Sequence, residues 1–261
     1  MNILFIGDII GKPGRRIIRE LLPSVINRYQ IDFCIANAEN AASGFGITRN
    51  VIRELLDMGV DCLTSGNHIW DKKEILEVIH LEPKLLRPAN YPEVTPGFTH
   101  GIYESNGGHQ VGVLNLAGRV FMSCVDCPFQ VARRLLPIIK KKSRFIIVDV
   151  HAEATSEKIA MGWFLDGQVS AVVGTHTHVQ TADERVLPKG TAYITDVGMT
   201  GPHDSIIGIR KEIALERFLT QMPQRFTIAS GDLWLNAVIV RCEAKTGLAE
   251  GIERIRIPLA Q

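Results

Sequence analysis

The chain has no apolar run near the roughly 18 residues that span a bilayer, so no membrane protein is expected. The amino terminus has no basic segment, and its apolar run is too short for a signal peptide, which predicts a cytoplasmic location. Lys and Arg number 29 against 28 Asp and Glu, a net charge of +1. Neither a stable nucleic-acid partner nor a membrane partner is therefore expected, and an anionic ligand needs a local site.

Cysteine is scarce and its spacing forms no framework. The chain has five cysteines, an odd number, and no secretion signal, which argues against a set of disulfides. Cys124-Val-Asp-Cys127 has the spacing of a zinc or redox motif, but no second pair is present to close a tetrahedral site. We expect these two thiols to be incidental, and Cys34 and Cys62 to be small core residues within strands.

What the chain does have is core material and a regular alternation of elements. Of 261 residues, 46% are hydrophobic, enough for one large domain, and we expect a single domain over residues 1–261. Three strands alternate with three helices in the first 80 residues, which indicates a parallel sheet. Two runs flanking Asn106-Gly107-Gly108 predict an antiparallel hairpin. The expected fold is α/β, with two packed mixed β-sheets flanked by helices. The predicted strands are 2–7, 32–36, 61–65, 99–104, 110–115, 144–150, 169–173, 190–195, 232–242 and 251–257. The predicted helices are 14–28, 48–58 (with Thr48 as N-cap), 71–79, 128–141, 156–165 and 211–220.

Five apolar runs end in side chains that bind metals. The donors are Asp8, Glu39, Asn40, Asn67, His151, His176 and His178. The carboxyl ends of strands in open α/β sheets face one crevice, so we expect these groups to meet. Imidazole and carboxylate together suit Mn, Fe, Zn or Co better than Ca or Mg. Seven ligands exceed the needs of one ion with an open position, which predicts two ions about 3.5–4 Å apart.

Each donor taken singly also has a structural interpretation. Asp8 follows a glycine and could be a turn residue, Asn40 could serve a loop, and His176 and His178 could form a polar strand edge. Five successive strands that all end in such groups are hard to explain as chance, and we favour the metal site.

The motifs resemble a known superfamily. Gly7-Asp8, Gly66-Asn67-His68, the isolated His151 and Gly174-Thr-His176-Thr-His178 are similar to the motif series of calcineurin-like metallophosphoesterases. The segments Gly-Asp-Ile-Ile-Gly-Lys-Pro-Gly and Asn-Ala-Glu-Asn-Ala-Ala resemble the YmdB-type bacterial phosphodiesterases, and the likeness runs from residue 1 to about 208. Two departures from the broad superfamily, Asp8-Ile9-Ile10 in place of Asp-x-His and Glu39 in place of a bridging aspartate, are typical of that branch.

The resemblance implies roles for these residues. It places a first ion at Asp8, Glu39, Asn40 and His178, and a second ion at Glu39, Asn67, His151 and His176, with Glu39 as the bridge. It implies attack of a metal-bridging hydroxide on a phosphodiester, with His68 as general acid. Hydrolysis of 2′,3′-cyclic nucleotides is the implied activity, and Fe or Mn, with Zn or Co as alternatives, are the implied ions. A phosphomonoesterase or protein phosphatase with the same metals, and a non-catalytic nucleotide-sensing regulatory protein, stay open as alternatives.

Other residues carry weaker signals for substrate binding. Lys12 and Arg15 open a helix beside Asp8 and could face phosphate, or could be a solvated helix start. Phe45 could stack on a base or cap the core. Thr200, with Asp196 and His203 close by, belongs to a Gly/Pro-rich loop over 198–208 that could be a lid or a connection. The apolar loop 116–127 could be a lid or a subunit contact in a homo-oligomer, a dimer or a tetramer.

Overall fold

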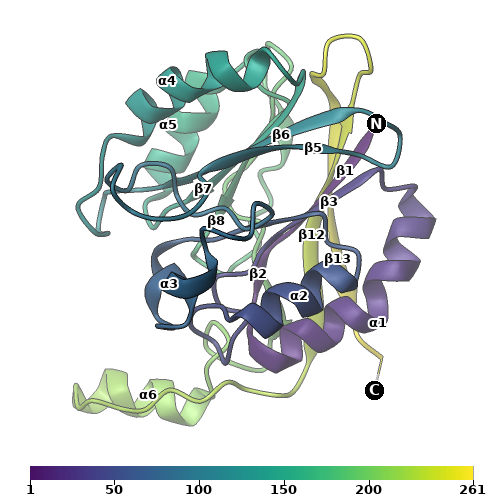
Figure 1. Ribbon diagram of the computed structural model, residues 1–261. Coiled ribbons are helices and arrows are strands. Elements are labelled where there is room, and N and C mark those ends of the chain that lie inside the picture. Colours follow the sequence, from purple (N-terminus) through teal and green to yellow (C-terminus); the bar gives the residue numbers. More distant parts are fainter. Residues whose placement is uncertain (261) are drawn as a thin grey trace.

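The computed structural model describes residues 1–260, which form two packed β-sheets with helices on both outer faces (Figure 1). The seven-stranded sheet contains, in spatial order, β2 (Asp8–Ile9), β11 (Met199–Pro202), β12 (Leu233–Cys242), β1 (Asn2–Ile6), β3 (Phe33–Asn37) and β4 (Cys62–Thr64), and β13 (Ala249–Pro258) pairs with β12. The six-stranded sheet contains β5 (His100–Glu104), β6 (Gln110–Ala117), β7 (Phe145–His151), β8 (Ala171–Thr175), β10 (Ala192–Ile194) and β9 (Arg185–Val186). The helices are α1 (Gly11–Tyr29), α2 (Arg49–Asp57), the 3₁₀ helix η1 (Asn67–Trp70), α3 (Ile75–Val78), α4 (Pro128–Lys140), α5 (Thr155–Leu165) and α6 (Lys211–Thr220).

Alternation along the strands divides the core into layers. In β1, Ile3 and Phe5 pack between the two sheets, whereas Leu4 and Ile6 face the layer that contains α1 and α2. Successive strand side chains point to opposite faces, so a strand buried on both faces is a continuous apolar run. The same alternation in β7 places Ile147 between the sheets and the residues on either side of it under α4 and α5. These layers confirm the predicted class of two mixed sheets flanked by helices.

The parallel strands carry their carboxyl ends to one edge of the molecule. β1, β3 and β4 pair in parallel in one sheet, and β6, β7 and β8 pair in parallel in the other. Because the two sheets are packed face to face, the loops after these strands come from both sheets. The predicted hairpin of β5 and β6 is confirmed as an antiparallel pair.

Several predicted elements differ from the structure. The helix predicted over 71–79 is wrong for its first turn, because η1 ends at Trp70 and α3 begins only at Ile75. The short strands β2, β9 and β11 were not predicted, and β11 occupies part of the predicted loop 198–208. Strand β11 is buried and pairs with β2 and β12, so residues 199–202 are sheet and the expectation of a loop there is corrected. The predicted cap of α2 is confirmed, since the Val51 N–H donates to the Thr48 hydroxyl at 3.4 Å.

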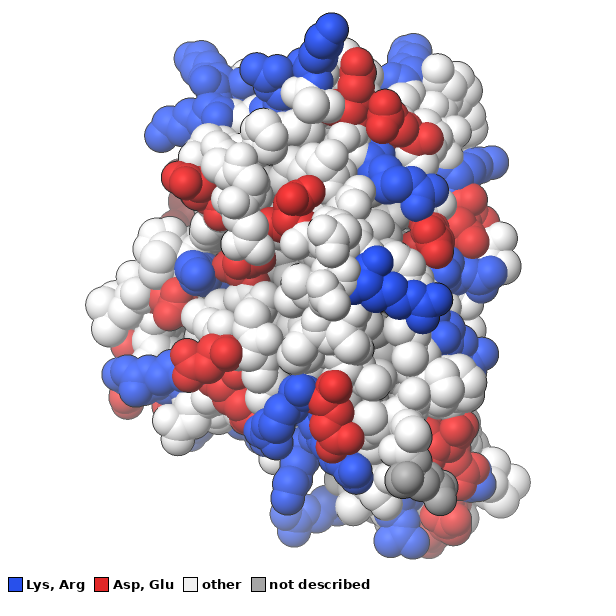
Figure 2. Space-filling model, turned by 90° about the vertical axis from the view of Figure 1, so that its right-hand side faces the viewer, with Lys and Arg blue, Asp and Glu red and all other residues white. Residues whose placement is uncertain are grey.

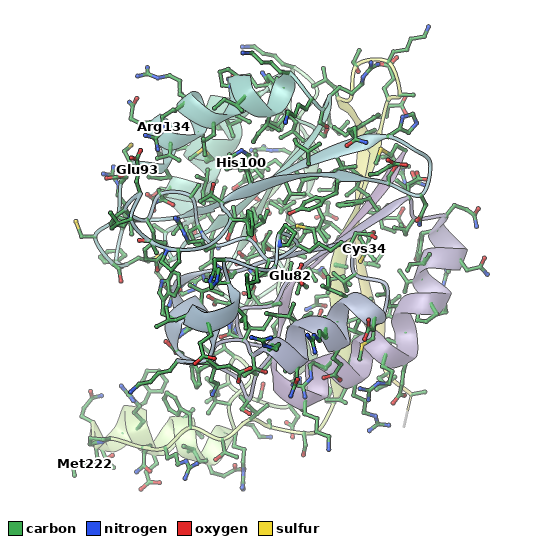
Figure 3. The ribbon with its side chains drawn as sticks, viewed as in Figure 1. Cys34, Glu82, Glu93, His100, Arg134 and Met222 are labelled. Carbon is green, nitrogen blue, oxygen red and sulfur yellow. The ribbon has the colours of Figure 1, made fainter. Side chains whose placement is uncertain are left out.

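Helix α6 stands apart from the layers. It extends from the lower edge of the molecule, and the labelled Met222 lies near the tip of this extension (Figures 1 and 3). Ala214 is the buried residue of this helix. We call residues 211–228, which comprise α6 and the segment returning from it, the arm. The single domain predicted over residues 1–261 stays a prediction, and Gln261 lies outside the described residues.

The surface matches the balanced charge of the sequence. Figure 2 shows Lys and Arg side chains interspersed with Asp and Glu on the face it presents. Within residues 1–260, no helix has the length and hydropathy that crossing a membrane requires.

Candidate metal centre

Four of the predicted ligands, from four different strand ends, surround one point. His151, the last residue of β7, has its Nε2 atom 3.1 Å from Glu39 Oε1 and 3.0 Å from Asn67 Oδ1. His176 Nδ1 lies 3.0 Å from the same His151 nitrogen. Ligands bound at 2.0–2.2 Å at right angles on one ion are about 3 Å from each other, so these separations suit a coordination shell. Glu39, His151 and His176 form the group of acidic and imidazole side chains that could hold a metal ion among the described residues.

Hydrogen bonding alone does not satisfy this group. His151 Nε2 carries at most one hydrogen, yet it faces an oxygen of Glu39, an oxygen of Asn67 and a nitrogen of His176. Glu39 and His151 are fully buried, where unpaired acceptors are costly. A cation among these acceptors would satisfy them together.

The remaining three predicted ligands lie on the other side of Glu39. His178 Nε2 is 3.9 Å from Asp8 Oδ1 and 3.3 Å from Asn40 Nδ2, and Asn40 Nδ2 donates to Glu39 Oε1 at 3.1 Å. Asp8 Oδ1 and Asn40 Oδ1 are buried and accept no hydrogen bond. Orphaned buried oxygens are rare in proteins, and a cation at this second point would pair with both of them. The donor set therefore fits metal binding on both sides of Glu39.

The ionisation of the group reflects its crowding. Burial would raise the pKa of Glu39, but the charge and hydrogen bond of His151 lower it to about 2. Burial would lower the pKa of His151, but Glu39 raises it to about 9. Burial, followed by the charge of His151, lowers the pKa of His176 to about 3. The pKa of Asp8 is raised, chiefly by burial. A protonated His151 thus balances the charge of Glu39 beside a neutral His176, and a metal ion bound at this point would displace the proton of His151.

Backbone geometry around the histidines is unusual. His176 has φ of 97° and His178 has φ of 65°, values that side-chain-bearing residues seldom adopt. Such strain persists only where the surroundings impose it, and it gathers at functional sites. At Gly66 an added Cβ would lie 2.2 Å from His151 Nε2 and 2.5 Å from Glu39 Oε2. Glycine is therefore required there because the ligands approach the backbone closely.

A buried network behind the site orients His151. Thr175 Oγ1 lies 2.9 Å from His151 Nδ1 and donates to Asp149 Oδ1 at 2.8 Å. The other oxygen of Asp149 accepts from Thr64 at 2.5 Å and from Asn37 at 3.1 Å. Burial raises the pKa of Asp149 to about 7. Asp149 was not predicted from the sequence, although an acid within the apolar run 146–150 was a usable signal.

His68 lines an open cavity of about 380 Å³ together with Glu39, Asn40, His176 and His178. Its backbone N–H donates to Glu39 Oε2 at 3.0 Å, and its Nδ1 lies 2.8 Å from Asp71 Oδ2. Asp71 thereby occupies Nδ1, and no hydrogen bond of the Nε2 atom is found within residues 1–260. Phe45 packs edge-on against the His68 ring, with centroids 5.1 Å apart, and also lines the cavity.

Three predicted substrate contacts lie elsewhere. Thr200 is buried in β11, where its hydroxyl donates to the Asn236 carbonyl and accepts from the Asn236 N–H; it does not line the cavity, and its contact with substrate stays a prediction. Arg15 is occupied by Glu54, at 2.8 Å, and by the Ala41 carbonyl. Lys12 is exposed and does not line the cavity. Arg15 thus contacts other residues of the protein and Lys12 is exposed to solvent, while a contact of either with phosphate stays a prediction.

The loops over 116–127 and 198–208, and some residues that were not predicted to belong to the site, also make defined contacts. Segment 118–127 is held to α5 because the N–H groups of Arg119 and Val120 donate to Glu157. His203 Nε2 lies 3.3 Å from Asn236 Nδ2, behind β11. Asp196 forms a buried ion pair with Lys158 at 2.7 Å, and nothing in the pattern of helix α5 had indicated that pair.

The arm also reaches the cavity, which Arg217, Phe218 and Phe226 line, and no local pattern in the sequence had indicated this.

Comparison with known proteins gives concordant matches over nearly the whole chain. A family model described as YmdB-like protein matches residues 4–255. A Bacillus subtilis protein named 2′,3′-cyclic-nucleotide 2′-phosphodiesterase is 52% identical over 98% of this chain and 97% of its own. The crystal structure of a hypothetical protein from Thermus thermophilus matches with a TM-score of 0.92 and 45% identity, covering 99% of each chain. The crystal structure of a phosphatase from Mycoplasma pneumoniae matches with a TM-score of 0.92 and 36% identity, covering 99% of this chain and 93% of the phosphatase chain. The strand-end motifs, the two-sheet fold and these matches agree, and the chain belongs to the YmdB-like family of metallophosphoesterase-type proteins.

Proposed function

We propose that this protein is a metal-dependent phosphodiesterase that hydrolyses 2′,3′-cyclic nucleotides. The observation that carries the proposal is the group formed by Glu39, His151 and His176 beside a cavity large enough for a small ligand. The name of the Bacillus subtilis relative, at 52% identity, supplies the substrate class.

We propose two ions that share Glu39. The first would be held by Asp8, Glu39, Asn40 and His178, and the second by Glu39, Asn67, His151 and His176. The orphaned oxygens of Asp8 and Asn40 support the first set, and the 3.0–3.1 Å separations around His151 support the second. Nitrogen and oxygen donors favour Fe or Mn, with Zn or Co as alternatives. When bound, the ions supply a nucleophile from water at neutral pH and positive charge for the phosphate oxygens.

The charge of the ligands suits a diester. Two divalent ions bring four positive charges, and the carboxylates of Asp8 and Glu39 offset two of them. The net positive site that results attracts a singly charged phosphodiester.

We propose that His68 protonates the leaving oxygen. Asp71 holds its Nδ1 at 2.8 Å, which orients the ring, and His68 lines the cavity. A ribose alkoxide is a poor leaving group, so a positioned proton donor contributes roughly 10²- to 10⁴-fold in rate.

A phosphomonoesterase activity is the second candidate. It is favoured by the Mycoplasma pneumoniae relative, whose crystal structure is described as that of a phosphatase. Turnover numbers for 2′,3′-cyclic AMP and for adenosine 3′-monophosphate, measured on one metal-loaded preparation, separate the two. A faster monoester reaction would contradict our first choice.

The test of the metal site combines elemental analysis of the purified protein with a screen of cyclic nucleotides. Asp8→Ala should lose bound metal together with activity, whereas His68→Ala should keep the metal and lose about 10²- to 10⁴-fold in kcat. His80→Ala, a change at an exposed histidine, is the matched control. Full metal content in Asp8→Ala would contradict the ligand set, and an unaltered kcat in His68→Ala would remove its acid role.

We also propose a homo-oligomer, a dimer or a tetramer. The exposed apolar side chains of Leu215, Leu219 and Met222 on the arm support it, because monomers seldom expose contiguous apolar surface. Light scattering on a size-exclusion column tests this, and a monomeric mass would contradict it.

A further inference from the structure

The cavity beside the metal centre has two chemically different sides. Glu39, Asn40, His176 and His178 lie on one side, with His68 next to them. The rest of the lining is mainly apolar and comes from the arm, from residues 206–209, and from Ile10 and Phe45. Its flat side chains are Phe45, Phe218 and Phe226, which we call the aromatic wall. A volume of about 380 Å³ falls within the usual range for small-ligand sites.

The aromatic wall is continuous with the proposed acid. Phe45 touches His68 edge-on, and the Phe45 and Phe226 rings are nearly parallel, with centroids 6.5 Å apart and an interplanar angle of 25°. The Arg217 guanidinium lies 5.1 Å from the centroid of Phe226, on the same wall. Aromatic faces and Arg guanidinium planes are the surfaces on which proteins stack nucleic-acid bases.

The wall leaves apolar area in contact with solvent. Phe218 is 71% exposed and Ile207 is 53% exposed, although both border the cavity. The base of the arm is fixed, since the Arg210 N–H donates to the Thr227 carbonyl at 2.9 Å and the Ala229 N–H donates to the Gly208 carbonyl at 3.0 Å. Phe226 therefore sits one residue from an anchored position, next to a surface that a flat apolar ligand would cover.

We propose that the aromatic wall binds the nucleobase of a nucleotide whose phosphate lies at the metal centre. This rests on the proposed phosphodiesterase function and adds the part of the substrate that the arm recognises. Stacking tolerates every base because each has a π face, so all four bases are accepted and purines, which offer more area, bind more tightly. Discrimination by base edges is not expected from phenylalanine side chains, which carry no hydrogen-bonding groups.

The test compares two cyclic diesters that differ only in the base. KM is measured for 2′,3′-cyclic AMP and for ribose 2′,3′-cyclic phosphate, which lacks a base, with Mn present. In Phe226→Leu, which keeps apolar bulk and loses the ring, the KM advantage of the nucleotide over the abasic diester falls about tenfold. One lost stack corresponds to roughly 5- to 150-fold in binding. Phe164→Leu is the control, because Phe164 forms an aromatic pair with Phe129 away from the cavity. A KM advantage that is the same in wild type and Phe226→Leu overturns the proposal.

A binding measurement separates this proposal from the proposed function. If the wild-type protein turns over neither diester, the phosphodiesterase proposal fails, and calorimetry with adenosine 3′-monophosphate on the Mn-supplemented protein then decides the base site. Binding that weakens about tenfold in Phe226→Leu and is retained in Phe164→Leu supports the aromatic wall. Equal affinity in Phe226→Leu and wild type, or no binding to the wild type, overturns it.

Discussion

Replacing Lys158 by Met tests how the strained turn of the two histidines is held. Lys158 is 1% exposed and Asp196 is fully buried, and their Nζ and Oδ2 atoms are 2.7 Å apart. The same Asp196 oxygen accepts from the Thr177 N–H at 3.1 Å and from the Thr177 hydroxyl at 2.6 Å. Thr177 stands between His176 and His178, so Asp196 ties down both predicted ligands.

The expected magnitude follows from the burial of this pair. Removing one partner of a buried ion pair typically costs about 3–5 kcal/mol, because the other charge is left uncompensated. Asp196 keeps its bonds from Thr177 and one from the Gly198 N–H at 2.7 Å, so we expect the lower end, about 3 kcal/mol. For a chain of this length, 1 kcal/mol lowers the Tm by about 2–4 °C, which predicts a fall of about 6–12 °C.

The assay is thermal unfolding followed by circular dichroism, with a parallel Mn titration. Lys158→Met should also bind Mn more weakly by roughly 10- to 100-fold, the range seen when a group that orients a ligand is lost. Lys142→Met, at an exposed lysine, is the control. The double variant Lys158→Met/Asp196→Asn should regain part of the Tm, since no charge is left unpaired. A Tm for Lys158→Met within about 2 °C of wild type would refute the reasoning.

Two further predictions concern Gly66 and Asp183. Gly66→Ala should reduce the affinity for Mn, measured by calorimetry, at least about tenfold, because the added Cβ would lie 2.2 Å from His151 Nε2. Gly107→Ala is the control and should leave the affinity unchanged, because the nearest atom to its added Cβ is 3.6 Å away. Equal affinities in the two variants would disprove the steric account. Burial would raise the pKa of Asp183, but hydrogen bonds from Thr195 and Thr181 lower it below its usual value. The ionised Asp183 carboxylate therefore stabilises the folded protein above about pH 4, and this stabilisation is lost as the pH falls through the lowered pKa. Urea titrations at pH 7, 5, 4 and 3 give the free energy of unfolding of the wild type and of Asp183→Asn. The difference between the two should shrink toward pH 3, and a constant difference would contradict the lowered pKa of Asp183.

Much of the fold and of the candidate site could be predicted because the signals are local. Strand β1 is a continuous apolar run, and Thr48 precedes α2 with a side chain that caps it. The donors at the ends of β1, β3, β4, β7 and β8 could be read as one site because parallel strands share the direction of their carboxyl ends. The side chains of Asp8, Glu39 and His151 lie close together, while their roles as metal ligands stay a prediction.

Other features depend on partners that are distant along the chain. Strand β11 exists because Met199 and Thr200 pair with Asp8 and Ile9, nearly two hundred residues earlier, and that pairing buries the Thr200 hydroxyl that had been assigned to substrate. Helix α3 is shorter than predicted, since residues 71–74 follow η1 through a turn.

The sequence by itself determined the kinds of donor groups and the strand ends that carry them, because both follow from residue type and from periodicity within a few residues. Tertiary structure alone decided that Lys158 neutralises Asp196 beneath the histidine turn and that Phe226 of the arm faces Phe45. These contacts join segments that are far apart in the sequence, and the local pattern of one segment does not predict its contact with the other. They form because packing two sheets and an arm places those side chains within reach.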